Sequence, residues 1–212
     1  MGQETEVEMI RTIQYKLYPN NSQAGTLARW MGTCCHTFNL ALDQRIKAYR
    51  RRGESVTYNQ QQALLTRQRG RIDKLRLVPV CFARDALRRV DRGMQAFFRR
   101  VKSGTGKPGF PRFKPGHRYN SMECAAVGTY LKGDRIRIPN LGLIRCRGRL
   151  LPQGTQRMLR VIRRASGWVA QIVLDDGKQP PAKRAVQQTI GVDVGLSSFA
   201  TLSTGGSIPN PR

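Results

Sequence analysis

The sequence predicts an α+β protein in which a small β-barrel or sandwich is interrupted by a group of helices. An alternating strand pattern occupies residues 10–18, and helical periodicity then runs from about residue 20 to residue 103. Five short strand patterns recur between glycine and proline residues over 121–174. The composition of both parts permits the early strand and the late strands to share one barrel, with the helices inserted between them, but does not require it.

The first strand and the first helix follow from side-chain spacing. Residues 10–18 alternate between apolar and polar side chains, which predicts a half-buried strand that Pro19 ends. Ser22 is expected to cap a long helix, which Gly53 ends. The apolar residues that keep helical spacing, and therefore predict a helix-bundle core, are Leu27, Trp30, Met31, Cys34, Phe38, Ala41, Leu42, Ile46 and Tyr49.

Two further helices are expected before residue 104. A polar helix is predicted over residues 57–77, where Thr57 and Gln60 have the spacing of a capping box. Another helix is predicted to start near Pro79. Its apolar stripe, which we expect to face the core, consists of Ala83, Leu87, Val90, Met94, Phe97 and Val101.

The rest of that last helix is strongly basic, and only Asp85 and Asp91 offset the charge locally. Exposed protein surfaces usually mix charges of both signs, so we interpret this face as one that contacts phosphates rather than as a merely solvated one. The candidate nucleic-acid-binding residues on it are Arg84, Arg88, Arg89, Arg92, Arg99 and Arg100.

Residues 102–118 have four glycines and three prolines, which exclude a regular element. Phe110 and Phe113 are candidates for base stacking, because aromatic and basic residues alternate in this loop. An equally weighted alternative is a linker that these two phenylalanines fix to the core. The candidate phosphate-binding residues of the loop are Lys102, Lys107, Arg112, Lys114 and Arg118.

The late strands are predicted at residues 121–126, 135–138, 141–147, 157–164 and 168–174. One face of them is expected to be basic, through Arg135, Arg137, Arg145, Arg147, Arg149, Arg160, Arg163 and Arg164. Within this set, Arg145 and Arg147 are candidate nucleic-acid-binding residues.

Composition indicates a polyanionic partner. The 212 residues include 38 Lys and Arg against 13 Asp and Glu, a formal charge of +25. A polyanion relieves the repulsion of so large an excess, and nucleic acid is the most common polyanion, followed by an anionic membrane. The sequence has neither the apolar run of a membrane-spanning helix nor the pattern of a signal peptide. None of the five cysteines has C-x-x-C spacing, so we expect reduced thiols and no zinc.

Asp193 is the one residue that suggests catalysis. It lies in a strand predicted over residues 189–194 and expected to be buried, between Gly191 and Gly195. Such a carboxylate suits a magnesium ligand, although a buried aspartate that accepts bonds from backbone amides fits the local sequence better. No acidic residue follows Asp193, and a two-metal site needs several carboxylates. We therefore expect the chain to stop before such a site is complete.

Several segments, in this order, resemble the transposon-encoded TnpB (OrfB) family of RNA-guided nucleases, which are relatives of the type V CRISPR effectors. The resemblance covers residues 10–212, and the segments are YKLYPNNSQ (15–23), FNLAL (38–42), ALRRVDRGMQAFFRRVKSG (86–104), GFPRFK (109–114), IRIPNLGLIRCRG (136–148) and IGVDVGLSSFATLSTGG (190–206).

This resemblance implies an oligonucleotide-binding-like wedge barrel, interrupted by a helical recognition domain and followed by an RNase H-like (RuvC) nuclease domain. The corresponding parts are residues 1–19 (first barrel strand), 20–103 (recognition helices), 104–176 (rest of the barrel), 177–188 (linker) and 189–212 (first hairpin of a RuvC domain that the chain truncates). The nuclease would sit in a prokaryotic cytoplasm, associated with the nucleoid.

The resemblance also implies partners and chemistry. The partners would be a guide RNA, target DNA and their heteroduplex, with no membrane involved, and base pairing would read the target sequence. Asp193 aligns with the first of the family's catalytic, metal-binding carboxylates, which implies Mg²⁺ in the complete enzyme. A nuclease segment supplied in trans could complete the site. Alternatives are a non-catalytic RNA-guided DNA-binding protein, a stand-alone RNA-binding protein and a transposase.

Overall fold

The computed structural model describes residues 10–104, 108–125, 130–149, 153–178 and 189–211. The chain divides into two compact units, Met1–Gln179 and Pro180–Arg212, and each is described by itself. Among the helices of the described ranges, none combines the length and the apolar character that crossing a membrane would require.

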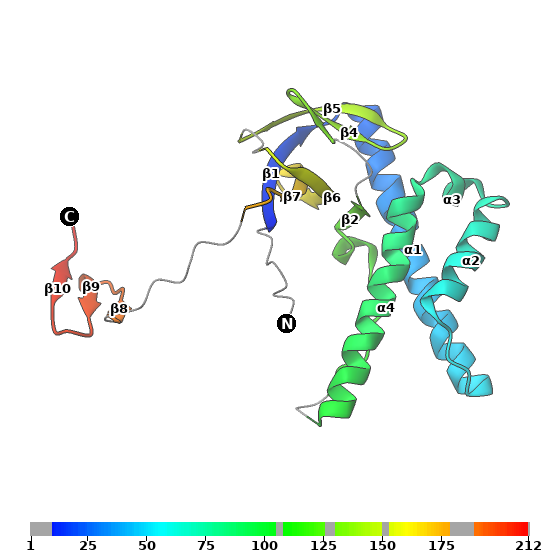
Figure 1. The fold of residues 1–212 in the computed structure, drawn as a ribbon, viewed down its shortest axis with the longest axis horizontal. Helices are drawn as coiled ribbons and strands as arrows, with labels where there is room; N and C mark the ends of the chain where they lie inside the picture. Colours follow the sequence, from blue (N-terminus) through cyan, green and yellow to red (C-terminus); the bar gives the residue numbers. More distant parts are fainter. Residues whose placement is uncertain (1–9, 105–107, 126–129, 150–152, 179–188, 212) are drawn as a thin grey trace, which may run out of the picture. The chain divides into compact units, whose positions relative to one another are not determined.

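The first unit contains one antiparallel sheet, built from strands on both sides of the helices in the sequence (Figure 1). Its strand order is β2-β6-β7-β1-β5-β4-β3, so β1 lies between β7 and β5 and joins the later strands as predicted. The strands are β1 (Ile10–Tyr18), β2 (Ser121–Ala125), β3 (Leu131–Lys132), β4 (Arg135–Ile138), β5 (Gly142–Gly148), β6 (Thr155–Arg164) and β7 (Gly167–Asp175). Of these, β3 was not predicted.

The sheet curls so that its two ends approach each other. The hydroxyl of Tyr130, just before β3, donates to the carbonyls of Cys124 and Ala125 in β2, at 3.3 and 3.0 Å. The backbone N–H of Tyr130 donates to the side chain of Gln156 in β6, at 2.8 Å. No ladder pairs β3 with β2 in the residues that the structure describes, so the architecture is a curled sheet rather than a closed barrel.

Four helices stand between β1 and β2 in the sequence: α1 (Asn21–Arg52), α2 (Tyr58–Arg69), α3 (Asp73–Leu77) and α4 (Val80–Ser103). The predicted cap of α1 was wrong by two residues. Asn20, not Ser22, caps the helix, because its side chain accepts from the backbone of Gln23 at 2.8 Å and the Gln23 side chain accepts from the backbone of Asn20 at 3.1 Å. Gly53 ends the helix with a φ of +66°, as a left-handed cap requires.

The single helix predicted over residues 57–77 is in fact two helices. Thr57 and Gln60 do form the expected capping box, but α2 ends at Arg69 and a turn at Gly70 leads to α3. The guanidinium of Arg69 donates to the carbonyls of Leu75, Arg76 and Val78, which ties α3 back against the end of α2. Helical periodicity in the sequence could not predict this contact.

The core is continuous from the inner face of the sheet into α1 and α4. Trp30 of α1 lies against Phe82 of α4, with ring centroids 6.3 Å apart, and Phe38 lies against Tyr119 at 6.2 Å. The predicted apolar stripes of α1 and α4 were wrong at their last residues, which we expected to face the core. Tyr49 is 67% exposed and Val101 is 51% exposed. The second half of α4 extends beyond the elements that cover its first half.

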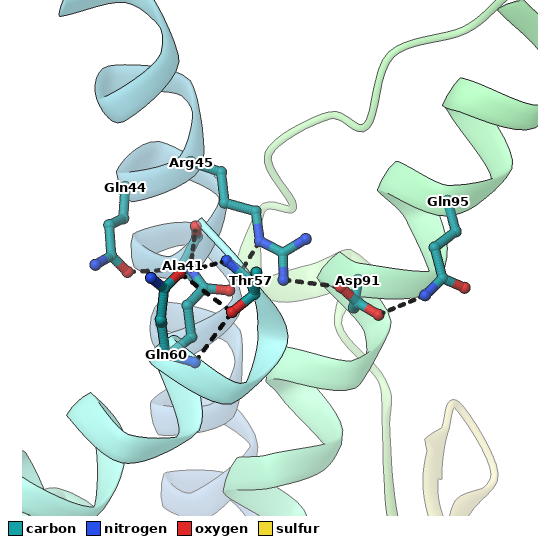
Figure 2. A network of polar contacts seen from close by, with 8 residues as sticks. Ala41, Gln44, Arg45, Thr57, Gln60, Asp91 and Gln95 are labelled. Carbon is teal, nitrogen blue, oxygen red and sulfur yellow. Dashed lines mark hydrogen bonds and ion pairs between the residues drawn. The ribbon is translucent and has the colours of Figure 1, made fainter. Parts of the chain in front are cut away.

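A polar network joins α1, α2 and α4 next to this core (Figure 2). The guanidinium of buried Arg45 donates to Gln61 of α2 and to Asp91 of α4, each at 2.9 Å. Gln61 in turn donates to the carbonyl of Ala41 at 2.8 Å, and Asp91 accepts from Gln95 at 2.8 Å. Arg45 and Gln61 are buried, and because their polar groups find partners in this network, they define how the three helices fit together.

The prediction of five free thiols was also wrong. Cys81 of α4 and Cys124 of β2 form a disulfide, while Cys34, Cys35 and Cys146 are buried thiols. The two paired cysteines are 43 residues apart in sequence, and the packing of α4 against β2 brings them together. Local spacing cannot reveal such a pair.

The second unit is a three-stranded antiparallel sheet of β8 (Val192–Asp193), β9 (Ser198–Leu202) and β10 (Ser207–Pro209). The strand predicted to be buried at residues 189–194 is exposed: Ile190, Val192 and Val194 are 49%, 58% and 68% accessible. A single small sheet covers neither of its faces, and among the described residues of this unit only Ala200 is buried.

Candidate nucleic-acid interface

The outer face of the curled sheet carries a compact group of cations, which we call the sheet patch: Lys16, Arg135, Arg137, Arg145 and Arg147. These side chains alternate with the buried residues of β1, β4 and β5, so all five point away from the core. The strand register places Lys16 opposite Arg147, and Arg145 between Tyr18 and Arg135. Three neighbouring strands thus bring the five cations onto one exposed surface.

The charges of the sheet patch are poorly compensated. Arg135 and Arg145 face each other across the β4–β5 ladder, and like charges in that position destabilise a sheet. Asp134 lies 3.8 and 4.0 Å from their guanidinium groups but is itself largely exposed. For Arg137 and Arg147, the described part of the chain offers no ion-pair partner. A polyanion would neutralise all of these cations.

The basic face expected along the strands does not extend unbroken over β6. Arg160 is engaged by Glu123 of β2, whose Oε1 accepts from its Nε at 2.8 Å and lies 2.7 Å from Nη2. Arg163 follows Leu159 and Val161 at two-residue intervals, so it shares the face of these buried residues and lies on the opposite face from Arg160 and Arg164.

The arginines of α4 divide into two groups. Arg89 lies at the contact between α4 and β2, which we call the α4–β2 joint and define by Asp85, Arg89, Glu123 and Arg160. Its Nε donates to Asp85 Oδ2 at 2.8 Å, its Nη1 donates to Ser121 at 3.1 Å, and its Nη2 lies 3.6 Å from Glu123. Both carboxylates are buried, so Arg89 has a structural task in addition to any contact with phosphate.

Within the α4–β2 joint, the carboxyl group of Asp85 lies in an electrostatically unfavourable position. Asp85 is fully buried, and burial raises the pKa of its carboxyl group, partly opposed by the attraction of Arg89. Its Oδ2 accepts from Arg89 and from the backbone N–H of Glu123 at 3.1 Å, whereas Oδ1 is buried without a hydrogen bond in the described structure.

The second group of α4 cations is exposed, although Arg92 lies 4.0 Å from Glu123 of the joint. Arg92, Arg99, Arg100 and Lys102 are exposed, and the Arg100 guanidinium donates to the carbonyl of Gly109 in the following loop at 2.9 Å. Arg84 and Arg88 are half-buried. The exposed end of α4 and the loop that it contacts therefore form a second basic surface.

The loop after α4 is also held against the helices by Phe110 and Lys114. Phe110 meets Phe97 of α4 edge-on, with ring centroids 5.1 Å apart. The backbone N–H and C=O of Lys114 both bond the side chain of Asn39 at 2.9 Å, and its Nζ lies 5.0 Å from the Phe38 ring. Burial, followed by repulsion from Arg89, lowers the pKa of the Lys114 ammonium.

Lys114 is therefore partly a packing residue, and the linker interpretation fits its surroundings. Arg112, Arg118 and Phe113 remain exposed, and Phe113 is 53% accessible. Phe110 is also 42% accessible, so both rings present a free face. Lys107 lies outside the described residues.

Asp193 stands in the edge strand β8, opposite Thr201, and is exposed. Gly191 pairs with Ser203 through both its N–H and its C=O, at 2.9 and 2.8 Å, which fixes the backbone just before Asp193. The carboxylate can supply one oxygen ligand to a magnesium ion. No cluster of three potential metal ligands occurs in the ranges that the structure describes.

Sequence reasoning did not single out Lys16 and Tyr18. Their alternation with the buried Tyr15 and Leu17 showed that they point outward, but it could not show which strand lies beside them. Only the pairing of β1 with β5 places them next to Arg147 and Arg145.

The chain is similar to a family model and to curated proteins. A family model described as a helix-turn-helix domain, HTH_OrfB_IS605, matches residues 9–54, the region of β1 and α1. The chain is 27% identical over 213 aligned residues to a Streptomyces pristinaespiralis protein named "Putative RNA-guided DNA endonuclease", a match that covers 95% of this chain and 50% of that protein. It is 22% identical to an Escherichia coli K12 protein named "Putative RNA-guided DNA endonuclease InsQ", over 94% of this chain and 48% of the relative. The chain thus spans about half the length of these curated relatives.

Proposed function

We propose that this chain, which its similarities identify as a relative of the TnpB (OrfB) proteins, is the guide-RNA- and target-DNA-binding portion of an RNA-guided DNA endonuclease. The sheet patch is the observation that carries the proposal. Its five cations come from three strands, form one exposed surface and include the like-charged pair Arg135–Arg145, which contributes nothing favourable to the fold. A phosphate backbone would turn that repulsion into attraction.

The character of the patch supports a particular kind of recognition. Arginine forks bind phosphate oxygens bidentately, and phosphate contacts position a nucleic acid without reading its bases. The protein would therefore hold a structured RNA and the guide–target duplex by shape and charge, while base pairing supplies sequence specificity. The exposed end of α4 and the loop with Phe110 and Phe113 would provide a second contact.

The nuclease activity belongs to the proposed complete protein. In it, Asp193 would be one of the carboxylates that hold Mg²⁺, and the ion would activate water for phosphodiester hydrolysis. Residues 194–212 bring no further carboxylate, so these 212 residues with guide RNA and magnesium are expected to bind a target without cutting it.

The proposal is tested by comparing two triple variants that remove the same charge. One changes Arg137, Arg145 and Arg147 to Gln, and the control changes three exposed arginines of the helical region, Arg50, Arg67 and Arg71, to Gln. Affinity for structured RNA and for an RNA–DNA heteroduplex is measured by fluorescence anisotropy over a series of salt concentrations. Removing the sheet patch should reduce the slope of log K against log salt by about 2 to 3, and the control by less than about 1. Equal changes in both variants would reject a dedicated phosphate surface.

A further inference from the structure

The disulfide between Cys81 and Cys124 crosses the α4–β2 joint. Cys81 lies in the first turn of α4 and Cys124 in β2, with their Cα atoms 4.9 Å apart, within the range that disulfides require. Cys124 directly follows Glu123, and Cys81 lies one turn before Asp85. The covalent bond and the ion pairs of the joint therefore hold the same two elements together.

This bond adds a covalent constraint at the edge of the sheet. Strand β2 is at the edge of the sheet and pairs only with β6 among the described strands, so α4 covers a strand with one ladder. The carboxylates of the joint are buried, and Asp85 keeps one oxygen without a hydrogen bond. A covalent link between Cys81 and Cys124 fixes α4 to β2 independently of these charges.

The remaining cysteines are poor competitors for oxidation. Cys34, Cys35 and Cys146 are all buried, and burial raises the pKa of each thiol, that of Cys34 to about 12. The thiolate is the form that reacts with oxidants, so these three sites are expected to stay reduced in the folded protein. Cys81 is only half-buried, which gives an oxidant access to the pair from one side.

From this geometry we propose that Cys81 and Cys124 form a reversible thiol–disulfide site, oxidised by hydrogen peroxide and reduced by dithiols, that locks the α4–β2 joint. The Cys81 thiolate attacks one peroxide oxygen, the O–O bond breaks, and a sulfenic acid and one water form. The sulfur of Cys124 then displaces the hydroxyl group as a second water. Two thiols lose two electrons and two protons to the peroxide, and a dithiol returns them by thiol–disulfide exchange.

The locked joint should raise the stability of the fold. A cross-link between residues 43 apart restricts the unfolded chain and leaves the folded chain as it is. For a protein of this size, we expect the oxidised form to melt roughly 10 °C above the reduced form. This inference is independent of the proposed function, because it concerns the fold and needs no nucleic acid.

The experiment compares peroxide-oxidised and dithiothreitol-reduced protein of these 212 residues. Thiols are alkylated before and after unfolding, and peptides are mapped by mass spectrometry. We expect one linked pair, Cys81 with Cys124, with the other three cysteines alkylated only after unfolding. The melting difference should disappear in Cys81→Ser and Cys124→Ser, persist in the matched control Cys146→Ser, and reverse when dithiothreitol is added.

Several results would overturn the proposal. One is a different linked pair, or no linked pair, after oxidation of the folded protein. Others are a melting difference that survives Cys81→Ser, and oxidation that dithiothreitol cannot reverse. If Cys124→Ser fails to fold because its site is buried, Cys81→Ser at the half-buried position decides the matter alone.

Discussion

The α4–β2 joint and the sheet patch are both rich in arginine, yet their surroundings are opposite. At the joint, Arg89 and Arg160 meet the buried carboxylates Asp85 and Glu123 at 2.7 to 2.8 Å. On the sheet patch, Arg135 faces Arg145, and Asp134, which lies 3.8 to 4.0 Å from both, is exposed. In a chain of charge +25, buried carboxylates thus engage the arginines of the joint, whereas the cations of the patch are left for a partner.

The largest effect is expected from removing Glu123, the carboxylate that Arg89 and Arg160 share at the joint. Glu123→Ala leaves Arg160 without its carboxylate partner and removes one of the two carboxylates near Arg89. Since Arg160 is 37% exposed and Arg89 keeps Asp85, we expect the free energy of unfolding to fall by ~2 kcal/mol. Chemical denaturation would measure the loss. The control Glu54→Ala removes an exposed pair with Arg52 and should change stability by less than ~0.5 kcal/mol. Similar losses in both variants would show that the ion pairs of the joint stabilise the fold no more than an exposed pair does.

A smaller effect is expected from the protonation of Asp85. Because its folded pKa is raised above the usual value of 3.8, the folded state holds this proton in a pH range where the unfolded state has released it. Stability from this group therefore falls as pH rises from about 3.8 to the folded pKa. The free energy of unfolding of the wild type minus that of Asp85→Asn should fall over this range and then level off. A difference that rises with pH would contradict a carboxyl group whose pKa is raised by burial.

The loop after α4 allows a matched pair of single changes. Lys114→Ala removes a side chain that packs over Phe38 and Tyr119, and it should lower the free energy of unfolding by ~1 kcal/mol. Arg112→Ala removes an exposed side chain and should leave stability unchanged within ~0.5 kcal/mol, while weakening RNA binding. Thermal unfolding and a binding titration of both variants decide this. If the two variants were equally stable, Lys114 would be a freely exposed cation rather than a packing residue.

The smallest effect tests whether the sheet patch opposes folding. Arg145→Gln removes the like-charge contact with Arg135, so it should raise the free energy of unfolding slightly, by ~0.3 to 0.5 kcal/mol at low salt. The gain should shrink as salt is added, because screening already weakens the repulsion. Destabilisation by this change would mean that Arg145 has a structural role that its exposed position does not suggest.

The sequence by itself determined most of the elements. The alternation over residues 10–18 and the long helices ending at Gly53 and starting after Pro79 were predicted correctly, because these patterns depend on neighbours within a few residues. The resemblance to TnpB was also readable from ordered motifs, and the comparisons confirm it. Net charge was enough to indicate a polyanionic partner, because it depends on composition alone.

Only the tertiary structure decided which residues lie together. Long-range strand pairing placed Lys16 of β1 beside Arg147 of β5, and helix packing on β2 engaged Arg89 and joined Cys81 to Cys124. Likewise, the apolar strand around Asp193 proved exposed, because burial depends on what covers a strand and not on its own composition. Periodicity specifies which way a side chain points, but the neighbours that it meets come from segments far away in the chain.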